Sequence, residues 1–198
     1  MAAATHETQH HTSTGVDSRK VMMWTFLASE CLFFGALIST YLIYQGQSLV
    51  GPYPRDILNI PVTSASTFVL LMSSLTMVLA MYGAQHGRLG MMKLMLLSTI
   101  LLGIGFLGFQ AYEFAEFVHY GLGLTTNQFG MSFFVLTGFH GTHVFFGVLY
   151  LLSLLIASNR RTGLGRDRAL HMDIAGLYWH FVDIVWIVIF TIIYLIPH

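Results

Sequence analysis

Five membrane-length apolar segments set the main constraint on the fold of this chain. They cover residues 21–44, 62–83, 92–111, 129–157 and 173–196. A helix rises about 1.5 Å per residue, so about 20 apolar residues cross a hydrocarbon core about 30 Å thick. Strands of a membrane barrel would instead alternate polar and apolar residues in runs of about ten. The sequence therefore predicts an all-α, polytopic membrane protein with five transmembrane helices.

The composition agrees with a membrane location. Hydrophobic residues make up 55% of the chain and charged residues only 9%, whereas soluble domains carry about 25% charged residues. The net charge is zero with neutral histidines, which argues against a nucleic-acid partner. A single cysteine, Cys31, excludes an internal disulfide and any multi-cysteine metal site.

The charged residues predict how the chain crosses the membrane. Residues 1–18 are polar and are expected to form a disordered cytoplasmic tail, and residues 19–198 one five-helix transmembrane domain. All but one of the nine Lys and Arg residues lie before the first segment or in the second and fourth loops, and only Arg55 lies on the other side. By the positive-inside rule, the N-terminus is predicted to be cytoplasmic and the C-terminus outside.

Ionisable side chains lie deep inside three of the apolar segments. The last segment carries His180 and Asp183 three residues apart, which places both on one helical face. Glu30, His140 and His143 lie at a similar depth in two other segments. A charged group at a helix centre costs about 2.5–3.5 kcal/mol on insertion scales, so these groups are expected to face protein. They are predicted to lie in one mid-membrane layer and to form a proton-linked or buried polar network.

Two interpretations of Glu30 stay open at this point. The carboxyl group either exchanges a proton or makes a structural hydrogen bond that fixes helix packing. Its expected partner is His180, which lies at a similar depth on a helix expected to be a neighbour. We predict that Glu30 is protonated or hydrogen-bonded to His180 at neutral pH.

The two histidines of the TGFHGTHVFFG stretch have two competing interpretations. His140 and His143 lie on one helical face and could offer two imidazoles to a metal. Membrane di-iron sites need many more histidines, so an interhelical hydrogen-bonding role is favoured for both residues. We predict no catalytic residue, no bound metal and no cofactor in this chain.

Three further features have structural interpretations. The aromatic residues Tyr178, Trp179 and Trp186 are expected to serve packing or lipid contact rather than a redox site. Glu113 and Glu116 are expected at the outer end of the third helix, facing water or another subunit. The second segment is expected to supply small residues for close helix packing, namely Thr63, Ser64, Ser66, Thr67, Ser73, Ser74 and Thr76.

Four motifs resemble subunit III of the haem-copper respiratory oxidases. They are SECLFFG at 29–35, GFQAYEF at 108–114, FFVLTGFHGTHVFFGVLYL at 133–151 and YWHFVDIVWIVIF at 178–190. The resemblance runs from about Arg19 to the end of the chain. It is closest to the short, five-helix bacterial form, because the longer members have two additional N-terminal helices.

The resemblance implies a supporting role in a proton-translocating cytochrome c oxidase of the bacterial plasma membrane. Subunit III of that family binds no haem or copper and packs on subunit I, which holds the haems and the copper centre, beside subunit II and small accessory subunits. It supports proton uptake, oxygen access and complex stability during oxygen reduction to water. Glu30 matches the family's carbodiimide-reactive membrane carboxylate, and His140, His143, His180 and Asp183 match its other buried polar positions.

Two points stay open within this interpretation, and one rival function is disfavoured. Longer members hold structural phospholipid in a cleft that their two additional helices help to form, so here the cleft is either completed by another subunit or absent. The electron donor is expected to be cytochrome c, with a quinol oxidase as the alternative. A proton-coupled transporter using Glu30 and Asp183 is disfavoured, because five spans do not divide into equal repeats and no span has an internal proline.

Overall fold

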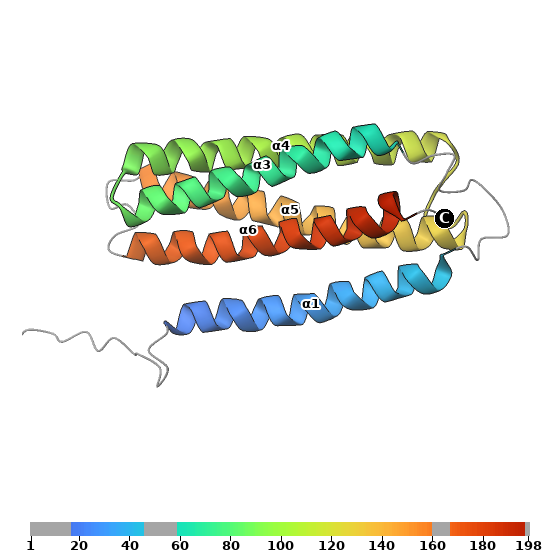
Figure 1. Cartoon of the computed structure of the whole chain (residues 1–198), viewed down its shortest axis with the longest axis horizontal. Coiled ribbons are helices and arrows are strands. Elements are labelled where there is room, and N and C mark those ends of the chain that lie inside the picture. Colours follow the sequence, from blue (N-terminus) through green and yellow to red (C-terminus); the bar gives the residue numbers. More distant parts are fainter. Residues whose placement is uncertain (1–16, 46–58, 160–166, 197–198) are drawn as a thin grey trace, which may run out of the picture.

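The computed structural model describes residues 17–45, 59–159 and 167–196. Five long helices cover most of them (Figure 1): α1 (Ser18–Tyr44), α3 (Ile60–Gln85), α4 (Leu89–His119), α5 (Gln128–Asn159) and α6 (Arg168–Phe190), which continues as a π-helical turn, η2 (Thr191–Leu195). Each of the five is long and apolar enough to cross a membrane. The prediction of five transmembrane helices is therefore confirmed. The predicted disordered tail lies outside the described residues, except that Asp17 caps α1 and Ser18 begins it.

Local signals in the sequence account for several helix ends. The Asp17 side chain accepts a hydrogen bond from the backbone N–H of Arg19 at 2.9 Å, which satisfies a free donor in the first turn of α1. Asn59 caps α3 in the same way, and a proline follows in the first turn. The tight turn between α3 and α4 passes through Gly87 at φ 68°, a left-handed conformation that glycine adopts without strain.

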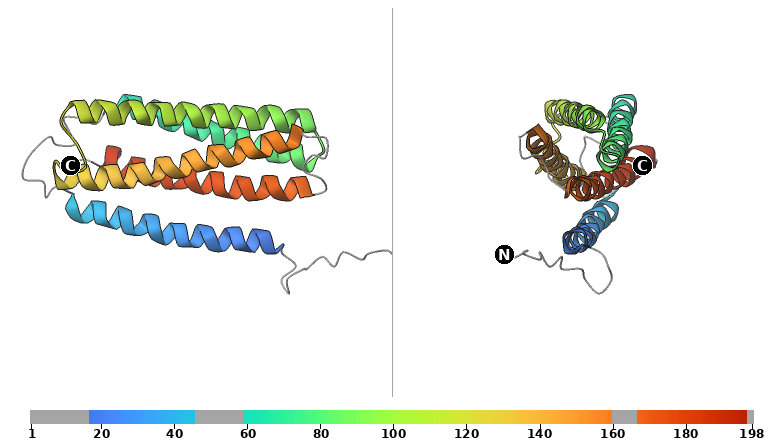
Figure 2. Two further views of the ribbon diagram at one scale, coloured as in Figure 1. Left: turned by 180° about the vertical axis from the view of Figure 1, so that it is seen from behind. Right: turned by 90° about the vertical axis from the view of Figure 1, so that its left-hand side faces the viewer.

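Helices α3, α4, α5 and α6 pack side by side, and α1 lies against the outside of this group (Figure 2). Helix α6 contacts α3, α5 and α1, so it occupies the centre of the arrangement. Helix α1 contacts α5 and α6, and its buried residues are Leu27, Phe34 and Tyr41. These three residues recur every seven positions, so α1 is held along one narrow stripe.

The end of the bundle where α1 begins carries positive charge. Every Lys and Arg among the described residues lies near a helix end there: Arg19, Lys20, Arg88, Lys93 and Arg168. Arg19 lies 2.9 Å from Asp167 and Lys20 lies 3.4 Å from Asp173, which ties α1 to the start of α6. These pairs are partly exposed, and such pairs contribute at most about 1 kcal/mol. These two pairs therefore add little to the packing of α1 along its apolar stripe.

Trp179 is the largest fully buried side chain and lies where three helices meet α6. Its indole N–H donates to Ser73 Oγ of α3 at 2.9 Å. Its ring lies against Gly103 of α4 and Gly147 of α5, where an added Cβ would come within 2.8 and 2.9 Å of the ring. Glycine is required at both positions because the tryptophan fills the space that a side chain would take.

We expect Gly147→Ala to destabilise the protein, because overpacking against Trp179 costs about 1–3 kcal/mol while alanine returns at most about 1 kcal/mol of helix propensity. Gly108→Ala is the matched control, because no atom lies within 4 Å of an added Cβ at Gly108. Thermal unfolding of the two variants in detergent measures the difference. Equal melting temperatures for both variants would contradict this packing.

Candidate functional site

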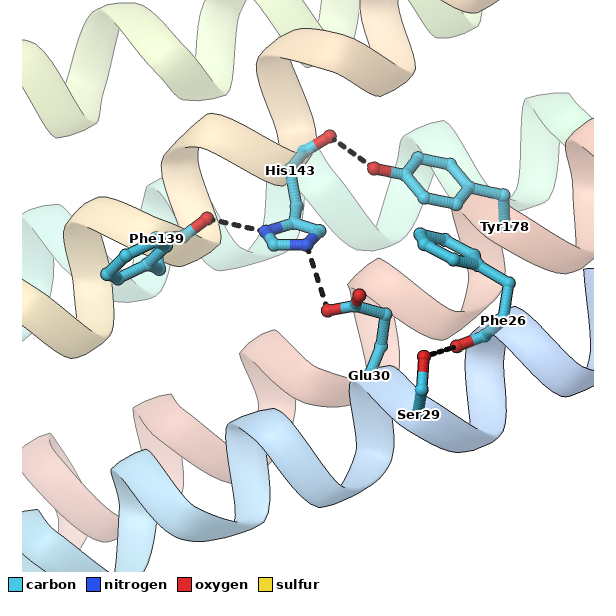
Figure 3. A network of polar contacts seen from close by, with 6 residues as sticks. All are labelled: Phe26, Ser29, Glu30, Phe139, His143 and Tyr178. Carbon is cyan, nitrogen blue, oxygen red and sulfur yellow. Dashed lines mark hydrogen bonds and ion pairs between the residues drawn. The ribbon is translucent and has the colours of Figure 1, made fainter.

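The centre of the candidate site is a pair of ionisable side chains that joins α1 to α5. Glu30 Oε2 lies 3.1 Å from His143 Nε2, and each side chain is 17% exposed (Figure 3). The predicted pairing of Glu30 with His180 is therefore wrong. Helix α1 neighbours both α5 and α6, and Glu30 lies on the face toward α5. Similar depth along the helices could not distinguish these two partners.

A backbone carbonyl fixes the proton on the other nitrogen of His143. The Nδ1 atom lies 2.7 Å from the carbonyl oxygen of Phe139, one turn earlier in α5. A carbonyl oxygen only accepts hydrogen bonds, so Nδ1 must carry a hydrogen. The Nε2 atom then either accepts a hydrogen from a protonated Glu30 or carries one toward an ionised Glu30. Either way, Glu30 and His143 share one exchangeable proton between them.

Neighbouring side chains hold the pair in position. Tyr178 of α6 donates its hydroxyl hydrogen to the carbonyl oxygen of His143 at 3.0 Å (Figure 3). Phe26 of α1 stacks on Tyr178 at 6.3 Å between ring centroids, and Phe34 meets the His143 ring edge-on at 5.0 Å. These contacts tie α1, α5 and α6 together at the pair. The sequence predicts packing or lipid contact for Tyr178 and gives no sign of this hydrogen bond.

His140 behaves differently from His143. It is fully buried, and in the part of the chain that the structure describes neither ring nitrogen has a hydrogen-bond partner. Its ring stacks on Trp186 at 4.8 Å and meets Phe106 edge-on at 5.9 Å. The predicted hydrogen-bonding role is therefore confirmed for His143 and wrong for His140. His140 packs as an aromatic ring because the residues around it are aromatic.

Helices α3 and α6 are joined by a line of polar contacts. The indole N–H of Trp186 donates to Thr67 Oγ1 at 3.0 Å, as Trp179 does to Ser73. His180 Nδ1 lies 2.6 Å from Ser74 Oγ. The sequence interpretation of the Ser and Thr residues as small packing residues was incomplete, because three of them also provide hydrogen-bonding groups to α6.

Asp183 lies beside this line of contacts. It is 3% exposed, and neither carboxyl oxygen makes a hydrogen bond among the described residues. The Ser74 hydroxyl lies near this carboxyl group, but it forms its hydrogen bond with His180. Asp183 and His180 thus share Ser74 as a neighbour on α3. Among the described residues, hydrogen bonds therefore join Glu30 to His143 and His180 to Ser74, and they do not link all five predicted residues in one network.

The third helix holds a buried carboxyl group that sequence analysis placed at the surface. Glu113 is 4% exposed and is hydrogen-bonded to Thr63 of α3. The prediction that it faces water or another subunit is wrong, whereas Glu116 is half-buried. Among the described residues, no group of three or more His, Cys, Asp and Glu is arranged to hold a metal ion.

Comparison with known proteins gives a consistent result. A family model described as cytochrome c oxidase subunit III matches residues 1–197. The chain is 43% identical over 172 residues to the cytochrome c oxidase subunit 3 of Bacillus sp. (strain PS3), covering 87% of this chain and 83% of the relative. It is 39% identical over 194 residues to the probable quinol oxidase subunit 3 of Staphylococcus saprophyticus, covering 94% of this chain and 96% of the relative. Identity to the cytochrome c oxidase subunit 3 of Bacillus subtilis is 40% over 173 residues, covering 87% and 83%.

Proposed function

The chain belongs to the cytochrome c oxidase subunit III family, and we propose that it serves a terminal cytochrome c oxidase as a subunit without a redox centre of its own. The complex as a whole would reduce oxygen to water and translocate protons. The haems and copper would belong to partner subunits, and this chain would pack directly on subunit I beside subunit II and small accessory subunits. Its contribution would be to support proton uptake, oxygen access and the stability of the complex.

The contact between Glu30 and His143 is the observation that carries the proton-uptake part of this proposal. A carboxyl group and an imidazole 3.1 Å apart can hold one exchangeable proton while the pair stays neutral. Release of that proton leaves one negative charge on Glu30, which favours the uptake of the next proton. Both side chains are partly exposed at the junction of α1 and α5. We therefore assign the pair the role of a proton reservoir for the proton-uptake path of the complex.

Cytochrome c is the donor that we propose, and a quinol is the alternative. Relatives named as subunits of both oxidase types match this chain at similar identity. The donor would bind elsewhere in the complex, so the residues described above do not select between the two.

We also propose that the chain lies in a bacterial plasma membrane with its N-terminus in the cytoplasm. The described Lys and Arg residues gather at the end of the bundle where α1 begins, and such residues favour the cytoplasmic side. A reporter test follows directly from this orientation. Alkaline phosphatase fused after His198 should be active and a fluorescent protein fused there should be dark, whereas the opposite pattern would reject the orientation.

The function is tested by purifying the complex through a tag on this chain in mild detergent. We expect haem bands in the reduced-minus-oxidised spectrum, together with a larger polytopic subunit and turnover with reduced cytochrome c. Turnover with a quinol and not with cytochrome c would select the alternative. A colourless, solitary five-helix protein would reject the oxidase function altogether.

The same preparation tests the reservoir. Glu30→Gln should slow proton uptake during turnover without changing the haem content, because glutamine keeps the shape of the side chain and loses its exchangeable proton. Glu116→Gln, which lies outside the pair, is the control. Equal proton uptake in the two variants would remove the role assigned to Glu30.

A further inference from the structure

Four buried polar side chains from four elements meet at the opposite end of the bundle from the positive charge. They are Tyr41 of α1, Thr63 of α3, Glu113 of α4 and Tyr194 of η2, with exposures of 1%, 0%, 4% and 5%. Thr63 bonds to Glu113, and Tyr194 interacts electrostatically with Glu113, Thr63 and Tyr41. The Tyr41 hydroxyl is buried and has no hydrogen-bond partner among the described residues. We call these four residues the outer cluster.

Within residues 17–45, 59–159 and 167–196, the carboxyl group of the outer cluster has no cation as a partner. Among the described residues, no Lys, Arg or His forms an ion pair with Glu113. The titratable groups found to interact with it are Glu116, one turn along α4, and the phenol of Tyr194, with Tyr41 beyond that phenol. A buried carboxylate without a counter-ion and with one hydroxyl partner would be strongly destabilising. A neutral, protonated carboxyl group avoids that cost.

The hydrogen bonds of Thr63 agree with a protonated Glu113. The Thr63 hydroxyl has one hydrogen, yet its oxygen contacts both Glu113 Oε1 and the carbonyl oxygen of Asn59, the latter at 3.1 Å. The carbonyl can only accept. When Glu113 carries a proton it donates to Thr63, and Thr63 donates its own hydrogen to the Asn59 carbonyl, so that both contacts of the Thr63 oxygen are hydrogen bonds. An ionised Glu113 would compete with Asn59 for that one hydrogen.

We propose that Glu113 is a second proton-binding site of this chain, separate from the Glu30–His143 pair, and that its proton keeps the C-terminal turn η2 docked on the bundle. The wide π-helical turn, closed by the bond from Ile196 N to Thr191 O at 3.1 Å, buries the two consecutive residues Ile193 and Tyr194. Tyr194 thereby reaches the outer cluster. Loss of the proton would place an uncompensated charge beside its phenol oxygen and weaken the docking of η2.

Infrared spectroscopy of the purified complex tests the protonation of Glu113. A protonated carboxyl group gives a carbonyl stretching band apart from the bands of ionised carboxylates. We expect one such band to disappear in Glu113→Gln, to remain in Glu116→Gln, and to shift in Thr63→Val but much less in Thr63→Ser, which keeps the hydroxyl. A Glu113→Gln spectrum that retains every carboxyl band and loses a carboxylate band would overturn the proposal.

Hydrogen exchange of the C-terminal peptide, followed by mass spectrometry, tests the docking of η2. At low pH the wild type and Glu113→Gln should exchange equally, because both carry a neutral, hydrogen-bonding group at position 113. As pH rises and Glu113 loses its proton, the released fraction of η2 in the wild type should increase by up to about tenfold per pH unit, the limit for one linked proton. Glu113→Gln should lack this increase. Equal exchange in both proteins at every pH would show that the proton does not control η2.

Discussion

The hydrocarbon core of a membrane offers no hydrogen-bond partner, and this constraint explains most of the polar contacts inside the protein. The indole N–H groups of Trp179 and Trp186 use the hydroxyl oxygens of Ser73 and Thr67 on α3. Gln110 of α4 donates to the carbonyl oxygen of Thr137 on α5 at 2.7 Å. Each of these contacts satisfies a buried group and also joins two helices. The polar residues therefore determine which helices are neighbours and at what relative depth, which apolar packing in lipid specifies less well.

The Glu30–His143 pair is an interhelical polar contact in which both side chains are ionisable. It attaches α1, the outermost helix, to α5 near the middle of both helices. The buried residues of α1 form a single apolar stripe along one of its faces. The Phe139 carbonyl commits one imidazole nitrogen to a permanent hydrogen, so the other nitrogen and the carboxyl group share the exchangeable proton. The same arrangement thus holds a peripheral helix and could store the proton that the proposed reservoir role requires. Within an oxidase that takes up protons during turnover, this is a reason to place a carboxyl group at such a position.

The five helices could be predicted from the sequence because length and hydropathy are local properties. The partner of Glu30 could not, because it depends on which face of α1 meets α5. The burial of Glu113 had a sequence signal that was not used: Phe106, Gln110, Glu113 and Phe117 recur at intervals of three and four residues, so they share one helical face, and all four are buried. No sequence pattern distinguished the role of His140 from that of His143, because the side chains that contact them come from helices far away in the sequence. The hydrogen bonds from the indole N–H groups of Trp179 and Trp186 to Ser73 and Thr67 likewise could not be predicted, because they depend on how α3 and α6 align.

The most direct test of the shared proton is the protonation of the His143 ring, read by solid-state nitrogen NMR on the chain in lipid. The His143 signals can be identified among the ten histidines by their loss in His143→Gln. The account predicts that Nδ1 carries a hydrogen at every pH at which the protein is folded. It also predicts that only the Nε2 signal responds to pH, and that Glu30→Gln alters this response while leaving Nδ1 protonated. A ring with an unprotonated Nδ1 would contradict the shared proton and with it the role of the pair.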